Sequence, residues 1–270
     1  MGAVATSMLF QPPQRPWEKN ANFIPIQTKT SKNRGHTINA SLVLAEGAKY
    51  TVLFSHGNAE DLRQIYSWFK DVAIKLGVNI LLYDYTGYGM TNKSRNPTEQ
   101  DCFKDITCVF EYLTGVQGYK EEEIILYGRS LGSGASCELA MRQSRKGRPV
   151  AGVILQSPLM SAYRVAFHFA YSFPGDLMCN IDKIGEITCP IFIMHGRLDE
   201  IVPFYHGEQL YLAIKEKYRY PPLWIKGAGH NNIELTLKKR SGTHDTFFGY
   251  IEDFMNYITE FQKQRQNQLR

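Results

Sequence analysis

Short apolar runs alternate with longer segments of helical periodicity from residue 23 onward. Apolar and polar residues alternate in the first two runs, 23–27 and 37–44, as they do in half-buried strands. The later runs are apolar at nearly every position, which is typical of parallel strands covered by helices on both faces. These later runs occupy residues 50–54, 78–83, 124–127, 150–155, 191–194 and 223–225.

The segments between these runs favour helices of ordinary length. The second of them follows Pro97 and opens with Thr98 and Asp101, a combination that indicates a capped helix start. The alternation predicts an α/β fold with a mostly parallel, doubly wound sheet and an antiparallel start. Because no repeat or flexible linker divides residues 21–270, we expect one domain there. The predicted helices span residues 60–76, 98–114, 131–145, 204–217 and 245–263.

The alternation breaks at residues 158–188, a segment rich in aromatic residues and methionine. Two interpretations of this insertion are open. In the first, the segment forms a small cap over a site and binds an apolar group through Met160, Tyr163 and Phe167. In the second, its rings pack a connecting helix against the core.

Composition narrows the function classes. The chain has 270 residues, with 31 Lys and Arg against 26 Asp and Glu and a net charge of +5. No block of Lys and Arg suits a nucleic-acid backbone, so nucleic acid is excluded as a partner.

The five cysteines form no CxxC pair and no zinc spacing with histidine, and we expect neither a metal nor a cofactor. With no signal-peptide pattern and no apolar window of about 20 residues, we expect a cytoplasmic protein.

The first 20 residues are interpreted as a tail that precedes the domain. The sequence begins MGAVAT, which matches the pattern for myristoylation of Gly2 and predicts peripheral attachment to a membrane. One myristoyl chain binds a bilayer only weakly, so a second contact is required. The candidates for that contact are two basic and two apolar residues, Arg15, Lys19, Leu9 and Phe10. The alternative is a tail that lies over the domain.

The strongest local motif is Gly128-Arg129-Ser130-Leu131-Gly132, a G-x-S-x-G sequence. It follows the apolar run at 124–127 and opens a helical segment, which is where a nucleophile elbow belongs. In such an elbow a strand turns sharply into a helix and projects the serine above the sheet. We therefore expect Ser130 to be a nucleophile.

A serine nucleophile requires a base, and the base requires an acid that orients it. In a doubly wound sheet both groups belong in loops at the carboxyl ends of later strands. Asp199 follows the apolar run at 191–194, and His230 follows the last run at 223–225. The chain order Ser130, Asp199, His230 therefore predicts a catalytic triad.

Other ionisable residues fit these positions less well. Glu200 is the alternative acid, whereas Asp84 follows a strand that comes too early in the chain. His195 is interpreted as a structural residue that closes its own turn. His244 lies in a polar stretch beyond the last strand, and no core strand precedes His36, His168 or His206.

The tetrahedral intermediate of acyl transfer needs two hydrogen-bond donors. The backbone N–H of Leu131 is the first candidate, because it lies at the start of the helix after Ser130. The second is expected from the loop that follows the run at 50–54. Asn58 is the preferred residue there, and Ala59 is the alternative.

With these residues in place, the chain resembles the serine-hydrolase branch of the α/β-hydrolase superfamily. It is most similar to the alpha/beta hydrolase domain-containing protein 17 family of protein depalmitoylases. The resemblance extends over residues 55–235. The segments that carry it are SHGNAEDL at 55–62, YDYTGYG at 83–89, YGRSLGSG at 127–134, SPLMSAYRVAF at 157–167 and PLWIKGAGHNNIEL at 222–235.

The resemblance implies a cytosolic, membrane-attached enzyme that cleaves the thioester between palmitate and protein cysteines, so that S-acylated proteins are the expected substrates. It implies the same roles for Ser130, Asp199 and His230. Two features depart from the family. Its animal members carry an acylated N-terminal cysteine cluster, whereas here no cysteine precedes Cys102. The stretch 236–245 also looks like extra length before the last helix.

Three other functions remain open at this stage. An esterase or lipase that acts on oxygen esters would use the same three residues, because both ester types pass through similar oxyanions. A peptidase would also use them, although no charged pocket for a peptide terminus is evident in the sequence. The alternative from another class is a non-catalytic, membrane-associated binding protein. The oligomeric state is left open.

Overall fold

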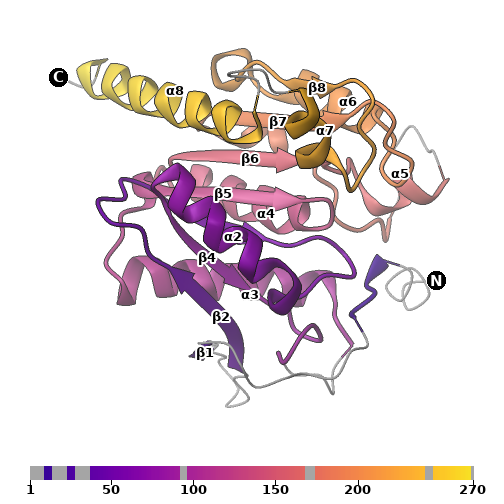
Figure 1. Ribbon diagram of the computed structural model, residues 1–270, viewed down its shortest axis with the longest axis horizontal. Helices are drawn as coiled ribbons and strands as arrows, with labels where there is room; N and C mark the ends of the chain where they lie inside the picture. Colours follow the sequence, from indigo (N-terminus) through magenta and orange to yellow (C-terminus); the bar gives the residue numbers. More distant parts are fainter. Residues whose placement is uncertain are drawn as a thin grey trace.

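The computed structural model describes residues 9–13, 23–27, 37–91, 96–167, 174–240 and 246–268. Within these residues eight strands form one sheet in the order β1-β2-β4-β3-β5-β6-β7-β8 (Figure 1). The strands are β1 Ile24–Gln27, β2 Thr37–Val43, β3 Thr51–Ser55, β4 Asn79–Tyr83, β5 Ile124–Arg129, β6 Gly152–Gln156, β7 Ile191–Gly196 and β8 Leu223–Ile225.

The sheet has an antiparallel edge and a parallel body. β1 pairs antiparallel with β2, and β2 pairs antiparallel with β4. Every later pairing, from β4·β3 to β7·β8, is parallel. The predicted α/β fold, with its mostly parallel sheet and antiparallel start, is confirmed. Because the strands from β3 onward are parallel, their carboxyl ends share one edge of the sheet, where a site can be assembled from several loops.

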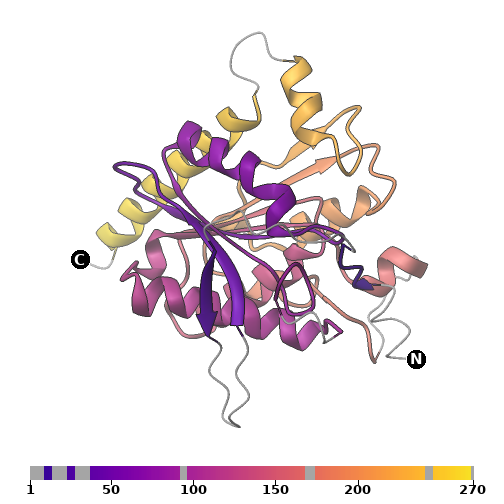
Figure 2. The same ribbon diagram turned by 60° about the horizontal axis from the view of Figure 1, so that its bottom comes forward.

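Helices cover both faces of the sheet (Figures 1 and 2). α2, α7 and α8 bury their apolar residues in one core cluster, and α3, α4 and α6 bury theirs in the other. Successive side chains of a strand point to opposite faces of the sheet, so Leu53 packs in one cluster and Val52 and Phe54 pack in the other. The helices are α2 Leu62–Leu76, α3 Glu99–Glu111, α4 Gly132–Arg145, α5 Ala162–Phe167, α6 Tyr205–Ala213, α7 Ile233–Arg240 and α8 Phe247–Gln268.

The helix boundaries differ from the prediction in three places. The helix expected to end at 217 stops at Ala213, because Ile214 adopts an extended conformation. The last helix runs on to Gln268 rather than 263. α7 was not predicted, and it occupies the first half of the stretch that looked like extra length. Its two turns bury only Ile233 and Leu237, too short a pattern to distinguish from a loop.

The insertion at 158–188 is small. Within its described parts, 158–167 and 174–188, the only α-helix is α5. Met160 is buried, while Tyr163 is partly exposed. Met178, from the returning arm, is fully buried against α4 at Gly134. The two methionines therefore pack on the core.

The N-terminal segment packs on the domain at residues 9–13. Phe10 is buried in the same apolar cluster as Tyr88 and Phe103, so the expectation that it inserts into a membrane is wrong. The Gln11 amide donates to Asn58 Oδ1 at 2.8 Å. Of the two interpretations of the tail, the one in which it lies over the domain holds for this segment. Gly2, Arg15 and Lys19 lie outside the described residues.

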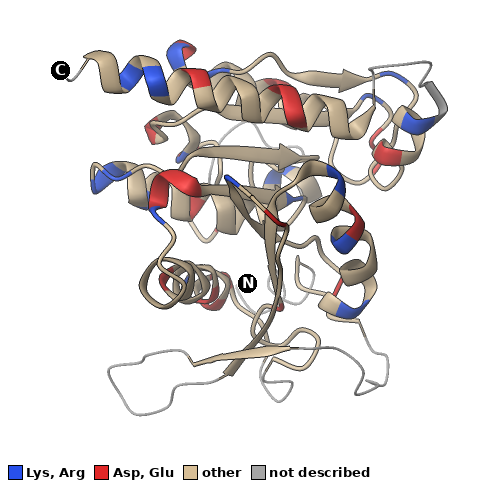
Figure 3. Cartoon of the chain, turned by 60° about the vertical axis from the view of Figure 1, so that its left-hand side comes forward, with Lys and Arg blue, Asp and Glu red and all other residues tan. Residues whose placement is uncertain are grey.

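Charges are mixed on the surface rather than gathered in one block. In Figure 3 acidic and basic residues lie together on the same helices, including α8, whose basic residues lie toward its C-terminal end. This placement favours the helix, because cations stabilise the negative end of the helix dipole. Among the described residues, no helix combines the length and the apolar character needed to cross a bilayer.

Candidate active site

Ser130 lies in a tight turn between β5 and α4. Its φ of +51° is in the left-handed region, which costs a residue with a side chain about 1–3 kcal/mol. The turn is held in place by its neighbours: the Ser130 amide donates to Gln156 O on β6 at 2.9 Å, and Ser133 Oγ donates to Ser130 O at 2.6 Å. A strained serine at the carboxyl end of a central strand is the geometry expected of a nucleophile elbow.

The two glycines of the motif allow the close approach that this turn requires. A Cβ on Gly128 would lie 2.6 Å from Gly132 O. A Cβ on Gly132 would overlap the carbonyl oxygen of Ser55, at the end of β3. A side chain on Gly128 would therefore push β5 away from the start of α4, and one on Gly132 would push the elbow away from the end of β3.

The loops that carry Asp199 and His230 are hydrogen-bonded to each other. The Arg197 amide donates to Ile225 O at 3.0 Å, and the Leu198 amide donates to Ala228 O at 2.8 Å. These bonds extend the pairing of β7 with β8 beyond the ends of the strands. The relative position of the acidic and the imidazole side chains is thus fixed by backbone contacts.

The structure brings the three predicted residues together. His230 Nε2 lies 3.0 Å from Ser130 Oγ, and His230 Nδ1 lies 2.8 Å from Asp199 Oδ2. Each of the three residues is about 8% exposed, so the chain of contacts is largely shielded from water yet reachable at the serine. Shielding strengthens both hydrogen bonds, because less solvent competes for them.

The carboxyl group of Asp199 is held in its ionised form. Burial by itself would raise its pKa, but contacts from His195 and His230 and the hydrogen bond from the Val202 amide outweigh burial and hold the pKa well below its usual range. The amides of Ile201 and Val202 donate to Oδ1 at 3.0 and 2.8 Å. Oδ2 is therefore left to face the imidazole of His230.

The amides of Asn58 and Leu131 are the predicted oxyanion donors. Within the described residues, neither backbone N–H donates a hydrogen bond to another group. Leu131 stands at the N-cap of α4, so its amide belongs to the positive end of that helix. Ala59, the alternative donor, has a φ of +57°. The assignment of these amides to an oxyanion hole stays a prediction.

The side chain of Asn58 fixes the loop that carries its amide. Its Oδ1 accepts hydrogen bonds from Tyr88 Oη at 2.7 Å, the Gln11 amide at 2.8 Å and the Ala59 amide at 3.0 Å. Tyr88 is fully buried. The Asn58 carboxamide is thus anchored to the core and to the N-terminal segment.

A polar network around Arg129 connects three parts of the site. Arg129, the residue before Ser130, forms an ion pair with Glu60 and lies 4.0 Å from Glu234 on α7. Glu60 Oε2 accepts from the Gly57 amide at 2.8 Å, at the start of the loop that holds Asn58. The guanidinium therefore ties the elbow to the Asn58 loop and to the helix that follows His230.

The alternative acids and histidines lie elsewhere. Glu200 is exposed, and Asp84 is buried with its Oδ1 accepting from the Leu62 amide at 2.8 Å. His206 is buried, and its Nδ1 accepts from the Met160 amide. His195 contacts Val202 O at 2.9 Å, which fits the predicted role in closing its turn, but it also contacts Asp199. The remaining three, His36, His168 and His244, lie outside the described residues.

The predicted substrate contacts are placed only in part. Met160 lies in the apolar core and Tyr163 is partly exposed, while the side chain of Phe167 lies outside the described residues. Their role in binding substrate stays a prediction. Within the described residues, no group of three or more His, Cys, Asp or Glu side chains is placed to hold a metal ion.

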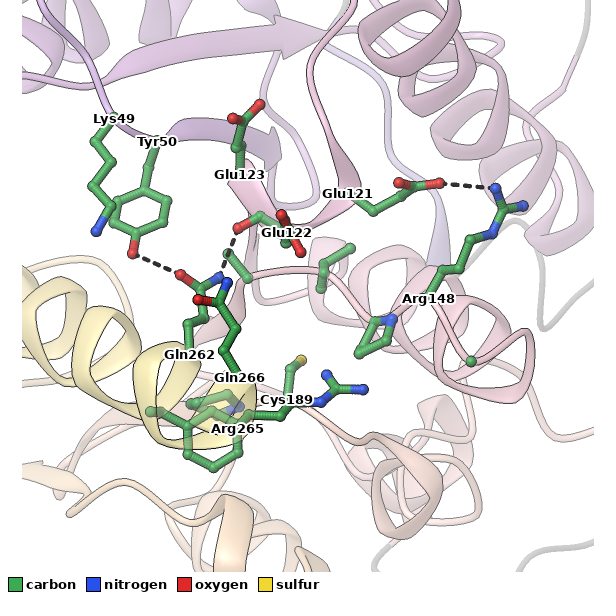
Figure 4. A pocket seen from close by; sticks show the side chains of 16 residues that line it. Lys49, Tyr50, Glu121, Glu122, Glu123, Arg148, Cys189, Gln262, Arg265 and Gln266 are labelled. Carbon is green, nitrogen blue, oxygen red and sulfur yellow. Dashed lines mark hydrogen bonds and ion pairs between the residues drawn. The ribbon is translucent and has the colours of Figure 1, made fainter. Parts of the chain in front are cut away.

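A cavity of about 420 Å³ lies at the amino ends of the strands, opposite the ends that carry the triad residues (Figure 4). It is lined by Tyr50, Glu123 and Pro190, which directly precede β3, β5 and β7, and by residues of α8. Since Ser130 lies beyond the carboxyl end of β5, this cavity is separate from the triad.

Sequence reasoning missed two features of the site. One is Arg129, and the other is the contact between His195 and Asp199. Arg129 stands inside the G-x-S-x-G motif, but its partner Glu60 is 69 residues away. For His195 a signal was available, because its spacing of four residues from Asp199 places both in one turn.

The sequence is similar to a known protein family and to curated relatives. A family profile described as "Serine aminopeptidase, S33" matches residues 46–173. The human protein named alpha/beta hydrolase domain-containing protein 17B is 44% identical over 214 residues, which cover 77% of this chain and 69% of the human one. The Xenopus tropicalis protein of the same name is 42% identical over 237 residues, covering 86% and 74% of the two chains.

Solved structures resemble the fold at low sequence identity. An esterase from Pyrococcus furiosus superposes with a TM-score of 0.68 at 16% identity, covering 92% of this chain and 99% of that one. The mouse alpha/beta hydrolase domain-containing protein 10 gives a TM-score of 0.63, also at 16% identity, covering 88% and 100%. At such identities the likeness shows the fold alone.

Proposed function

The chain belongs to the alpha/beta hydrolase domain-containing protein 17 family, a family with the serine-hydrolase fold, and on that premise we propose that it hydrolyses acyl thioesters with Ser130, His230 and Asp199 as a catalytic triad. The observation that carries the proposal is the unbroken line of contacts from Ser130 Oγ through both nitrogens of His230 to Asp199. The substrates we propose are proteins that carry palmitate on cysteine.

The first half of the reaction is acylation of the serine. His230 Nε2 takes the proton from Ser130 Oγ as the oxygen attacks the acyl carbonyl carbon. Asp199 stabilises the imidazolium that forms, because its carboxylate stays ionised. The amides of Leu131 and Asn58 receive the oxyanion, and each such donor is worth about 2.7–4 kcal/mol in systems where it has been removed.

Collapse of the intermediate releases the cysteine. The imidazolium gives its proton to the departing sulfur, which leaves as a thiol, and the acyl group stays on Ser130 as an ester. A water molecule then gives a proton to His230 and attacks the acyl-serine through the same oxyanion site, and the imidazolium returns that proton to Ser130 Oγ as the acyl bond breaks. The products are the free fatty acid and the restored serine, so the cycle balances without a cofactor.

One observation supports a bulky substrate over a small ester. The insertion at 158–188 contains only the six-residue helix α5 in its described part, which leaves little there to enclose a small molecule. We further propose a cytoplasmic location with peripheral membrane contact, in which Gly2 supplies the lipid. An oxygen-ester substrate is the second candidate.

The test compares a palmitoyl-cysteine peptide with its matched oxygen ester and with a short-chain ester. The protein is assayed as wild type, Ser130→Ala and Ser136→Ala, and each form is also treated with a fluorophosphonate probe. Ser136 is a matched control, since it is a buried serine on α4 whose Oγ has no hydrogen-bond partner among the described residues.

We expect the wild type and Ser136→Ala to turn over the long-chain thioester fastest and to label, and Ser130→Ala to do neither. Labelling of Ser130→Ala at the wild-type rate would refute the assignment of the nucleophile. If only short oxygen esters turn over, the triad stands and the thioester substrate is wrong. If the wild type neither labels nor turns over any ester, the protein is a binding protein on a hydrolase fold.

A further inference from the structure

A second histidine contacts the acid of the proposed triad. His195 lies on β7, is fully buried, and places Nε2 3.1 Å from Asp199 Oδ2. This is the same oxygen that His230 Nδ1 approaches to 2.8 Å. Asp199 Oδ2 is therefore contacted by two imidazole rings.

The contacts of His195 determine which of its nitrogens carries the hydrogen. Nε2 lies 2.9 Å from Val202 O, and a carbonyl oxygen can only accept, so the hydrogen is on Nε2. Nδ1 has no hydrogen-bond partner within the described part of the chain. A Cβ on Gly207 would lie 2.5 Å from Nδ1, so α6 runs close against that edge of the ring. The donor that His195 offers to its neighbours is therefore the N–H at Nε2.

The N–H group at Nε2 of His195 lies against the carboxylate of Asp199. Its dipole places positive charge beside Oδ2, and this contact helps to hold the pKa of Asp199 well below its usual range.

The turn that holds Asp199 does not depend on His195 alone. The Ile201 and Val202 amides already bind Oδ1, and the Leu198 amide binds Ala228 O. These bonds fix one carboxylate oxygen and the backbone. Among the described side chains that contact Asp199, His195 and His230 are the two that reach Oδ2.

We propose that His195 is a positioning residue for acyl transfer, which acts through Asp199 by holding Oδ2 on the line to His230 Nδ1. The inference rests on the proposed triad, and it extends that triad to four residues in series. It also gives the fully buried polar group on β7 a role beyond closing a turn.

The test replaces His195 with a side chain that keeps the donor and with one that does not. His195→Gln retains an N–H group near the position of Nε2, whereas His195→Met keeps a similar bulk without a donor. Glu200→Gln is the control, since that carboxylate is next in sequence to Asp199 but exposed. Each full-length variant is measured for thermal unfolding and for kcat and KM on whichever ester the wild type hydrolyses.

We expect His195→Met and His195→Gln to lower the Tm by similar amounts. His195→Met should lower kcat about ten- to a hundredfold with KM within a factor of about two, as expected when a hydrogen bond to a charged group is lost. His195→Gln should recover most of kcat, and Glu200→Gln should match the wild type.

Equal values of kcat for His195→Gln and His195→Met would overturn the inference, whether both are high or both are low, because the donor would then be irrelevant. If Ser130→Ala keeps the wild-type turnover, the proposed function fails instead, and the two failures are therefore distinguishable. If His195→Met does not fold, a value of kcat for His195→Gln at or below one-hundredth of the wild type overturns the inference, and a value near the wild type supports it.

Discussion

The histidine that precedes the Asn58 loop should make stability depend on pH. His56 is fully buried beside β3, and its Nδ1 lies 2.7 Å from Gly57 O, so Nδ1 carries the hydrogen. Burial, with a smaller contribution from the charge of Arg129, lowers the pKa of His56 from 6.5 to about 4, against the opposing effect of the Gly57 contact. The native ring therefore stays neutral at pH values where the ring in the unfolded chain is protonated.

The sign and size of the effect follow from proton binding. Above pH 6.5 neither state binds the proton, and His56 contributes no pH dependence. Between pH 6.5 and about 4 the unfolded chain binds more protons, so the free energy of unfolding falls as the pH falls. At about 1.4 kcal/mol per pH unit, the loss reaches about 3 kcal/mol by pH 4. That is a large part of the stability of an ordinary domain.

The assay is urea unfolding at pH 7.5, 6.5, 5.5 and 4.5 for the wild type, His56→Asn and Ser55→Ala. Asparagine retains a donor for Gly57 O but does not titrate. Ser55→Ala removes a buried hydroxyl that lies 2.9 Å from Tyr83 Oη at the end of β3, next to His56 in the chain, and serves as the control. We expect the wild type and Ser55→Ala to lose stability in parallel as the pH falls. His56→Asn should lose about 2–3 kcal/mol less over this range. Parallel curves for all three proteins would refute the reasoning.

Two further predictions concern the elbow and its ion pairs. Gly132→Ala should lower the free energy of unfolding by about 3 kcal/mol or more, because its Cβ meets the Ser55 carbonyl. Gly115→Ala is the control: no atom lies within 4 Å of a Cβ there, and the free energy of unfolding should change by about 1 kcal/mol or less. Equal melting temperatures by circular dichroism would contradict this. In a double-mutant cycle of Arg129→Met with Glu60→Gln, the unfolding free energies should show a coupling of about 1–2 kcal/mol. Additive effects would show that the pair contributes nothing to the link between the elbow and the Asn58 loop.

The residues that could be predicted from the sequence are those whose position follows from a strand end. Ser130, Asp199 and His230 each lie in the turn or loop that follows an apolar run, and parallel strands bring their carboxyl ends to one edge. Chain order and local pattern were therefore enough to group them. The strands were predictable because their apolar residues alternate with polar ones in β1 and β2 and form continuous runs in the later strands.

The parts that could not be predicted depend on contacts between distant segments or on very short patterns. The bond between Gln11 and Asn58 joins residues 47 positions apart, and it is made by a backbone amide, which leaves no trace in the sequence. Phe10 was a candidate membrane contact, because an isolated apolar residue looks the same whether it packs on the domain or inserts into lipid. α7 has only two buried apolar residues to mark it.

The strand order also has a consequence for the chain as it leaves the ribosome. The elbow and the Asn58 loop belong to β5 and β3, near the middle of the sheet, and are synthesised within the first half of the chain. The acid and the imidazole come with β7 and β8, the last two strands to be made and the outer two on their side of the sheet. A chain that ends before His230 therefore lacks the proposed base for Ser130. On the proposed mechanism, we therefore expect Ser130 to become reactive only when translation is nearly complete.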